Sequence, residues 1–370
     1  MNDKIIPQKM LSFLANIVMG QSPSSKFYNS DGNGVVLVQG NSDLNNRKTI
    51  SRVWTTKATK EVKANSILMS VRAPVGHIAL SSEKICIGRG FCSIEPKEDT
   101  SKEFLYHYLI SLEKRWKRVK QGSTFSSVNK KEIEKLLICQ FCIKEQKKIA
   151  KILNCWDEAI ETLEKLVEAK EKFNRGLRRM LLNQTTRSPL FHKKWKTKNL
   201  GDLTNIKTGS KDLKDKDSSG SYPFYVRSDN IHKINTYAYD GEAILIPGEG
   251  RVGEIFHYIN GKFDYHQRVY MINKFSNIIL SKYIYFYLQE FFKRQAIKYS
   301  VKATVNSLRL PMFLKMAITY PCIKEQELIV KTLNTLESET KILSILQDDI
   351  TSQKRGLMQQ LLTGKTRVKV

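Results

Sequence analysis

The sequence predicts an α+β protein with two α/β domains in tandem, separated by two long antiparallel coiled-coil helices, the whole being pseudo-two-fold symmetric. Three observations predict this: the chain repeats itself in order, short apolar runs and Gly or Asn turns fill the front of each copy, and a heptad stripe fills the back. The expected parts are a first domain over 1–142, a first long helix over 143–183, a linker over 184–199, a second domain over 200–322 and a second long helix over 323–363.

The internal repeat is the strongest of these observations. The matching segments are 11–20 with 200–209, 67–76 with 244–253, 104–109 with 283–288, 128–129 with 305–306, 142–146 (CIKEQ) with the identical 322–326, and 175–177 (RGL) with the identical 355–357. The first copy carries roughly a dozen additional residues between Leu44 and Ile67. The copies agree at their ends and diverge in their middles, which predicts one scaffold that presents two different surfaces.

The front of each copy is predicted to be a compact α/β domain. Apolar runs such as 35–38 (VVLV) and 243–246 (AILI) have the length and composition of buried strands. One helix is predicted within each front part, over 102–118 in the first copy and 281–298 in the second.

The back of each copy is predicted to be one long helix, because apolar residues recur on alternating steps of four and three. The residues expected to pair the two helices are Ile149, Leu153, Trp156, Ile160, Leu163, Leu177, Leu333, Leu336, Leu343, Ile350 and Leu357. Polar residues interrupt the stripes, namely Lys170 and Asn174 in the first and Thr340, Gln347 and Lys354 in the second. Neither helix can bury its stripe alone, so each is the other's expected partner. The alternative is a pair of core helices in separate domains, but such helices are usually much shorter.

The repeat leads to a further hypothesis about assembly. Equivalent stripes would let the first helix pair with a second copy of itself. Residues 1–190 alone would then dimerise through Trp156, Ile160 and Leu163 and read a palindrome. Lys170 and Asn174 would lie near the seam of both partners and weaken such a dimer.

The charge balance favours a polyanionic partner. The chain has 62 Lys and Arg against 36 Asp and Glu, a formal net charge of +26. Binding phosphates would neutralise this surplus and release counterions; the alternative is a Lys-rich surface without such a partner. No run of 18 apolar residues exists, so no membrane helix is expected. The 6 cysteines suggest neither a disulfide pattern nor zinc-site spacing, which favours the reducing cytoplasm.

Polar and basic residues on predicted turns are the candidates for contact with double-stranded DNA. They are Arg72, Lys117, Arg118, Lys120, Gln121, Ser123, Thr124, Asn129, Arg227, Arg251, Gln267, Arg268, Lys302, Thr304 and Asn306. Lys and Arg can neutralise phosphates, and Ser, Thr, Asn and Gln can bond to phosphates or base edges. For any single residue a plain surface role is the alternative, and as a set in a basic chain they favour DNA.

No active site is visible in the sequence, so the protein is expected to be non-catalytic. Residues 248–253 (GEGRVG) fit GxGxxG, but a strand is expected to follow over 254–259, and a tight turn shared with 71–76 explains both copies. Asp43 with 61–63 fits only a degenerate nuclease pattern. Cys139 and Cys142 form a lone CxxC inside 136–143, which is predicted to be a buried strand. No P-loop, amino-methyltransferase motif, catalytic triad or metal-ligand set is present.

Four segments together resemble the specificity subunit of type I restriction-modification enzymes. They are LGDL at 200–203 preceded by Trp195, the GST…VN segment over 122–129, the IKEQ at each helix start, and KRGLMQQLLTG over 354–364. The first copy lacks the Trp that precedes Leu200, so its first segment is expected to pack differently.

This resemblance covers nearly the whole chain and implies a function. It implies two target-recognition domains, each reading one half of a split DNA site, with no cofactor in this chain. It also implies methyltransferase subunits that use S-adenosylmethionine and motor-nuclease subunits that use ATP and Mg. The alternatives are the recognition part of another class of restriction-modification enzyme and a non-catalytic coiled-coil adaptor.

Overall fold

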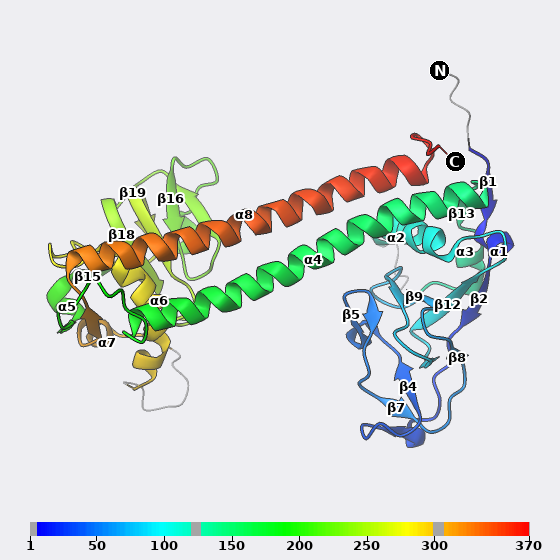
Figure 1. Ribbon diagram of the computed structural model, residues 1–370, viewed down its shortest axis with the longest axis horizontal. Coiled ribbons are helices and arrows are strands. Elements are labelled where there is room, and N and C mark those ends of the chain that lie inside the picture. The colour runs from blue at the N-terminus through cyan, green and yellow to red at the C-terminus, as the bar shows by residue number, and fades with distance from the viewer. Residues whose placement is uncertain (1–5, 120–126, 299–306, 370) are drawn as a thin grey trace. The chain divides into compact units, whose positions relative to one another are not determined.

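The computed structural model describes residues 6–119, 127–298 and 307–369, and the chain forms two compact units (Figure 1). Unit 1 comprises Met1–Glu164 and Leu346–Val370, and unit 2 comprises Lys165–Ile345. Each unit therefore joins the front of one repeat to the helix end of the other. The predicted α+β class, with tandem α/β domains and two long helices, is confirmed. The compact units nevertheless differ from the expected parts, because each 40-residue helix begins in one unit and ends in the other.

Unit 1 combines short strands with α-helices and with parts of both long helices. Its strands are β1 (Gln8–Met10), β2 (Ala15–Met19), β3 (Tyr28–Asn29), β4 (Val35–Val38), β5 (Leu44–Asn45), β6 (Lys48–Thr49), β7 (Trp54–Thr55), β8 (Glu61–Val62), β9 (Ile67–Ser70), β10 (Ile78–Leu80), β11 (Ile85–Ile87), β12 (Phe91–Pro96) and β13 (Leu137–Cys139). Its helices are α1 (Leu11–Leu14), the 3-10 helices η1 (Ser25–Phe27) and η2 (Asn41–Asp43), α2 (Lys102–Val119), α3 (Lys130–Glu134), the first part of α4 (Ile143–Leu182) and the last part of α8 (Ile323–Leu362). The sheets have the orders β2-β12-β9-β10-β6-β5, β3-β7-β4-β11-β8 and β1-β13.

Unit 2 repeats the same plan with fewer strands among the described residues. Its strands are β14 (Lys196–Asn199), β15 (Asn205–Thr208), β16 (Tyr222–Tyr225), β17 (Ile231–Ile234), β18 (Tyr239–Pro247), β19 (His257–Tyr265), β20 (Val269–Asn273) and β21 (Ala317–Tyr320). Its other helices are α5 (Leu200–Leu203), the 3-10 helix η3 (Leu213–Asp215), α6 (Ser281–Lys298) and α7 (Leu310–Leu314). The sheets have the orders β15-β20-β18-β19-β16-β17 and β14-β21.

The two units share a frame and differ in what is attached to it. The antiparallel run β2-β12-β9-β10 corresponds to β15-β20-β18-β19, and β1-β13 corresponds to β14-β21. Strands β5 to β8 occupy the stretch where the first copy has its additional residues. The predicted division into a common scaffold and divergent middles is therefore found in the backbone.

Three local expectations were wrong. Segment 184–199 is not linker throughout, because its last residues form β14 on β21. The strand expected at 254–259 begins only at His257. In 136–143 only β13 is a strand, and it is not buried throughout, because Leu137 is 46% exposed and Cys142 is exposed where α4 is about to begin.

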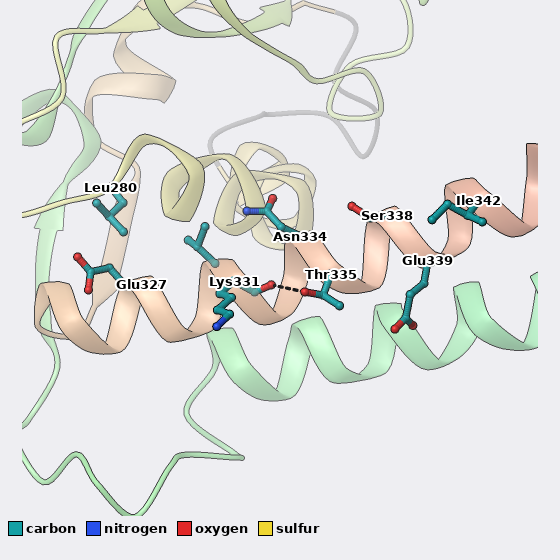
Figure 2. A pocket seen from close by; sticks show the side chains of 9 residues that line it. Leu280, Glu327, Lys331, Asn334, Thr335, Ser338, Glu339 and Ile342 are labelled. Carbon is teal, nitrogen blue, oxygen red and sulfur yellow. Dashed lines mark hydrogen bonds between the residues drawn. The ribbon is translucent and has the colours of Figure 1, made fainter.

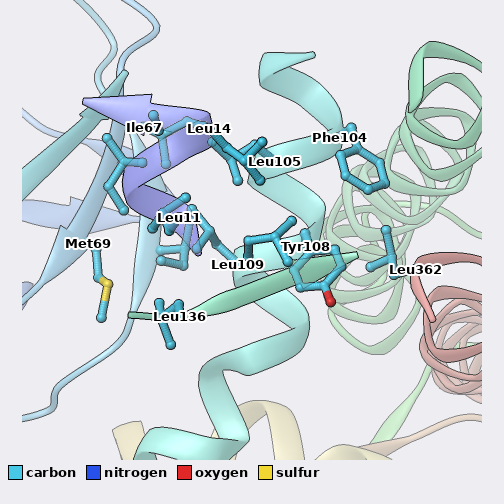
Figure 3. Close-up of a cluster of buried hydrophobic side chains, with 14 of the residues drawn as sticks. Leu11, Leu14, Ile67, Met69, Phe104, Leu105, Tyr108, Leu109, Leu136 and Leu362 are labelled. Carbon is cyan, nitrogen blue, oxygen red and sulfur yellow. The ribbon is translucent and has the colours of Figure 1, made fainter. Parts of the chain in front are cut away.

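The core of unit 1 unites the sheet, α2 and the end of α8. Figure 3 shows Leu362 of α8 near Phe104 and Tyr108 of α2, and the same cluster extends across Leu109 to Leu11, Ile67 and Met69. Burying such a side chain contributes about 1.5–3 kcal/mol. The helix end supplied by the second copy is therefore part of the hydrophobic core of unit 1.

The helices pair antiparallel within each unit. In unit 1, Asp157 contacts Lys354 and Glu164 contacts Gln347. Residues later in α4 therefore contact residues earlier in α8, as in an antiparallel pair. In unit 2, Lys170 Nζ lies 2.7 Å from Glu339 Oε2. Every residue expected to pair the helices is buried or half-buried, with Ile149, Leu153 and Leu333 fully buried. The polar interruptions of the stripes make these ion pairs and hydrogen bonds across the helices.

Candidate nucleic-acid interface

One tight turn occurs in both units, after β9 in unit 1 and after β18 in unit 2. Gly76 and Gly253 end it with φ angles of 84° and 69°, a region that favours glycine. A Cβ on Gly76 would stand 2.3 Å from the Trp116 ring of α2. No helix follows Gly253, because the chain proceeds to β19. The GxGxxG in 248–253 is therefore a structural turn, as predicted, and not a dinucleotide fingerprint.

This turn pairs with the chain segment that follows α2 or α6. Arg72 forms a β-bridge with Ser127, and Glu249 forms the equivalent bridge with Ser307. The backbone N–H of Val128 donates to Val71 O at 2.9 Å, as that of Leu308 does to Gly248 O at 2.7 Å.

These bridges correct the predicted match of 128–129 with 305–306. Residues 127–129 correspond instead to 307–309. The two-residue identity Val-Asn was too short to set the register where the copies differ in length.

Several predicted DNA contacts fall in the parts of the chain that the structure does not describe. Lys120, Gln121, Ser123, Thr124, Lys302, Thr304 and Asn306 lie outside the described residues, as do the side chains of Lys117 and Arg118 in α2. Asn129 is described, and its side-chain oxygen accepts the backbone N–H of Glu132 at 3.0 Å. Glu132 in turn accepts the Asn129 N–H, which makes a capping box for α3. Asn129 thus stabilises a helix start.

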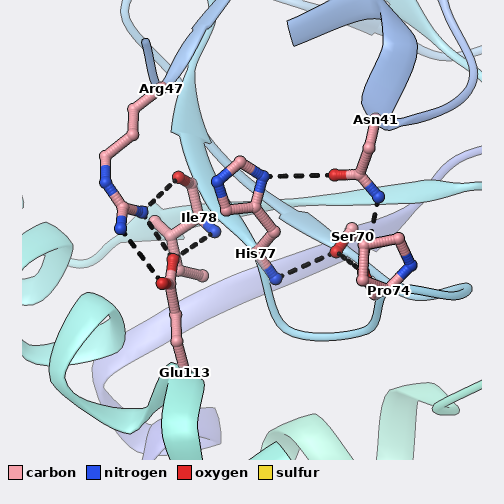
Figure 4. A network of polar contacts seen from close by, with 7 residues as sticks. All are labelled: Asn41, Arg47, Ser70, Pro74, His77, Ile78 and Glu113. Atoms are coloured by element: carbon pink, nitrogen blue, oxygen red, sulfur yellow. Dashed lines mark hydrogen bonds and ion pairs between the residues drawn. The ribbon is translucent and has the colours of Figure 1, made fainter. Parts of the chain in front are cut away.

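A polar network fixes the turn that carries the exposed Arg72 (Figure 4). Ser70 Oγ donates to Pro74 O at 2.7 Å and accepts the His77 N–H at 2.9 Å. The His77 ring contacts Asn41 Oδ1 at 3.1 Å. Arg72 itself stays outside this network, on a turn whose backbone is held on both sides.

The same figure shows how the additional strands of unit 1 are attached to α2. Asn46 and Arg47 both have positive φ, at 43° and 60°, as a two-residue hairpin between β5 and β6 requires. Arg47 makes a bidentate pair with Glu113 of α2, at 2.5 Å and 3.0 Å, and also donates to Ile78 O at 3.0 Å.

In unit 2 the predicted arginines come together around acidic side chains. Arg227 Nη1 lies 3.2 Å from one carboxylate oxygen of Glu249, and Arg268 Nη1 lies 3.3 Å from the other. Arg251 Nη1 lies 2.5 Å from Asp229 Oδ2, and its Nε lies 3.2 Å from Glu254 Oε2. We call these six residues, together with Lys293, the arginine cluster.

The arginine cluster is open to solvent. The side chains of Arg227, Arg251 and Arg268 are 52%, 62% and 60% exposed. Lys293 of α6 donates to Glu254 at 2.7 Å, and this bond together with the Arg251 bond lowers the pKa of the Glu254 carboxyl. With Lys293 the cluster holds one more cation than carboxylates, so its guanidinium groups are oriented but remain accessible to another anion.

Gln267 lies apart from these pairs, beside η3. Its Nε2 donates to Asp212 Oδ2 at 3.2 Å, and His266 lies 3.5 Å from the same carboxylate. The backbone N–H of Leu213 lowers the pKa of Asp212, and His266 contributes further. From the sequence these Arg and Gln residues are candidates for DNA contact, which stays a prediction, and Glu249, Asp229 and Glu254 are not among the candidates. The one sequence signal for these three acids is that they lie close in sequence to the arginines, and a pattern based on basic residues alone does not include them.

The described residues also form a groove along one of the long helices. A groove along α8 is lined by Leu280, Glu327, Val330, Lys331, Asn334, Thr335, Ser338, Glu339 and Ile342 (Figure 2). Within it Thr335 Oγ1 donates to the Lys331 carbonyl at 3.0 Å, which is a bond internal to the helix. In the described ranges no His, Cys, Asp and Glu residues group as metal ligands, and no helix has the length and apolarity to cross a membrane.

Comparison with known proteins assigns both repeats to one family model. The model described as "Type I restriction modification DNA specificity domain" matches residues 9–171 and 192–352. The putative MjaX specificity subunit of Methanocaldococcus jannaschii is 37% identical over 167 residues, which cover 45% of this chain and 39% of that protein. The MjaVIII specificity subunit of the same organism is 25% identical over 367 residues, covering 87% of this chain and 84% of that protein. This chain thus spans well under two thirds of MjaX.

Solved structures show the same fold. The S subunit of a type I restriction-modification system from M. genitalium superposes with a TM-score of 0.62 at 17% identity, covering 98% of this chain and 97% of that one. A chain from a study of complex assembly in the type I system gives 0.63 at 16% identity, covering 98% and 99%.

Proposed function

The chain belongs to the family of type I restriction-modification DNA specificity domains, and we propose that it is a specificity subunit that reads a split double-stranded DNA site. One observation carries the proposal most directly. The same frame occurs twice with different strands attached, and each copy holds an arginine on the same bridged turn, Arg72 in unit 1 and Arg251 of the arginine cluster in unit 2. Two similar frames with different surfaces suit the reading of two different short sequences.

We assign base reading to the turn that carries Arg72 in unit 1 and to the arginine cluster in unit 2. Guanidinium groups bind guanine O6 and N7 in pairs of hydrogen bonds. Glu249 orients Arg227 and Arg268 before DNA arrives, and base edges or phosphates then replace Glu249 as acceptors. Lysines elsewhere on the +26 chain would neutralise phosphates.

The partners are the remaining part of the proposal. We infer that the chain assembles in the cytoplasm with methyltransferase subunits that hold S-adenosylmethionine and with motor-nuclease subunits that use ATP and Mg. This chain would then contribute recognition and positioning, with the chemistry carried out by its partners. The family match favours this assignment over the recognition part of another enzyme class or a coiled-coil adaptor.

Exchange of one recognition surface tests this function. Replacing residues 25–125 by those of a relative should change one half of the methylated motif and leave the other half unchanged, since each unit presents its own surface. Methylation mapping of host DNA with and without the exchanged gene measures the motif. A motif that changes in both halves, or in neither, would show that the units do not read separately.

A further inference from the structure

The end of each long helix packs on the front part supplied by the other repeat. Residues 165–187, which comprise the end of α4 and the five residues after it, belong to unit 2, and their equivalents 345–367 fall almost wholly in unit 1. Both ends finish with the same contact, because Arg187 pairs with Glu325 and Arg367 pairs with Glu145. This shared contact does not distinguish one helix end from the other.

The contacts just before it do differ. In unit 2, Arg178 Nη1 donates to Gln289 Oε1 at 3.1 Å, and its Nε lies 3.4 Å from Glu290 Oε2. Arg179 Nε donates to the other oxygen of Glu290 at 2.7 Å. The Glu290 side chain is only 6% exposed, so these two arginines neutralise a nearly buried carboxylate of α6.

The equivalent place in unit 1 is apolar. Met358 stands where unit 2 has Arg178, is 7% exposed, and lies in the core cluster. Ile110 of α2, the counterpart of Gln289, packs against the same cluster. Ser111 replaces Glu290, and its hydroxyl donates to its own helix at Tyr108 O. The helix end and the surface that it contacts are thus both polar and charged in unit 2, whereas in unit 1 the helix end is apolar and the charged partner is absent from that surface.

A second matched set lies nearer the middle of the helices. In unit 1, the nearly buried Lys354 bonds to Asp157, beside the fully buried His107. In unit 2, Asn174 takes the place of Lys354 and donates to Thr340 Oγ1 at 2.8 Å and to Leu336 O at 3.0 Å. The residue equivalent to His107 is the buried Phe286.

We propose that the front part of each repeat is matched to the helix end of the other repeat and discriminates against the helix end of its own repeat. Pairing like with like would set Arg178 against Ile110 and Ser111 and leave Glu290 buried without a cation. A charge left unpaired in a buried place is strongly unfavourable. The dimer of residues 1–190 expected from the repeat would bury Arg178 in this way. The matching thus keeps the two different units together, and it is independent of DNA recognition.

The test uses the full chain with the two helix ends exchanged, 165–187 for 345–367. The composition and the heptad positions are unchanged, but each front part now contacts the helix end of its own repeat. We expect the Tm to fall by at least about 6 °C, the size typical of a broken buried ion pair in a unit this large. Exchange at two exposed equivalent positions, Lys172→Ser with Ser352→Lys, is the matched control and should leave the Tm unchanged.

Smaller substitutions at each of the two contacts test the proposal if the exchanged chain does not fold. Met358→Arg should lower the Tm, and adding Ile110→Gln with Ser111→Glu should restore at least half of the loss. In unit 2, Arg178→Met should lower the Tm and Gln289→Ile with Glu290→Ser should restore it. A native Tm in the exchanged chain, or no recovery from moving the acceptors, would overturn the proposal.

Discussion

Seven residues added to each long helix should lengthen the gap between the two half-sites by about three base pairs. Modification of the original site should then be lost. The insertions follow Glu168 in α4 and Asp348 in α8, which are equivalent positions of the repeat. Seven helical residues add about 10 Å, and base pairs rise about 3.4 Å each. Modification mapping in the host measures the new gap.

The helix contacts explain why this extension should be tolerated. Seven residues preserve the apolar stripe, because the stripe has a period of seven. Asp157–Lys354 in unit 1 and Lys170–Glu339 in unit 2 lie on either side of the insertions and keep their register. Seven residues added to α4 alone would shift one helix against the other and should abolish modification. An unchanged gap with both insertions would mean that the helices do not set the spacing.

How far the sequence predicts this fold depends on the range of the interactions involved. The long helices were predicted closely because a heptad stripe is a local pattern, and α4 ends one residue before the expected boundary. The compact units were not predicted, since each depends on residues that are far apart in sequence, such as Leu109 and Leu361, sharing one hydrophobic cluster. The strand orders of the divergent middles depend on similar long-range pairings.

The candidate site was predictable in composition but not in arrangement. Arg227, Arg251 and Arg268 were chosen as basic residues near predicted turns. Their convergence follows from β18 lying beside β20 in the sheet and from the turns at the ends of these strands. Glu249 was not predictable in this way, because an acidic residue in a basic chain does not indicate DNA binding. Its importance appears only when both arginines are seen on one carboxylate.

The arginine cluster leads to the second large effect. Arg227→Ala and Arg268→Ala should each weaken binding to the cognate site by about ten- to hundredfold, as expected for loss of a bidentate guanine contact. Only the half-site read by unit 2 should become degenerate. Binding to unrelated DNA should change little, because base contacts contribute little to non-specific affinity. Affinity for cognate and scrambled duplexes, measured over a range of salt concentrations, separates the loss of specific binding from any change in non-specific binding.

Two further variants make this experiment decisive. Arg175→Ala is the matched control, because Arg175 lies on α4, is 62% exposed and pairs with Glu171 of the same helix rather than with an acid of the cluster. Glu249→Gln retains both arginines while freeing them from their shared carboxylate. It should raise affinity for scrambled DNA and so reduce the ratio of specific to non-specific binding. Equal losses in Arg175→Ala and Arg268→Ala, or an unaltered motif in the Arg227 and Arg268 variants, would show that this cluster does not read DNA.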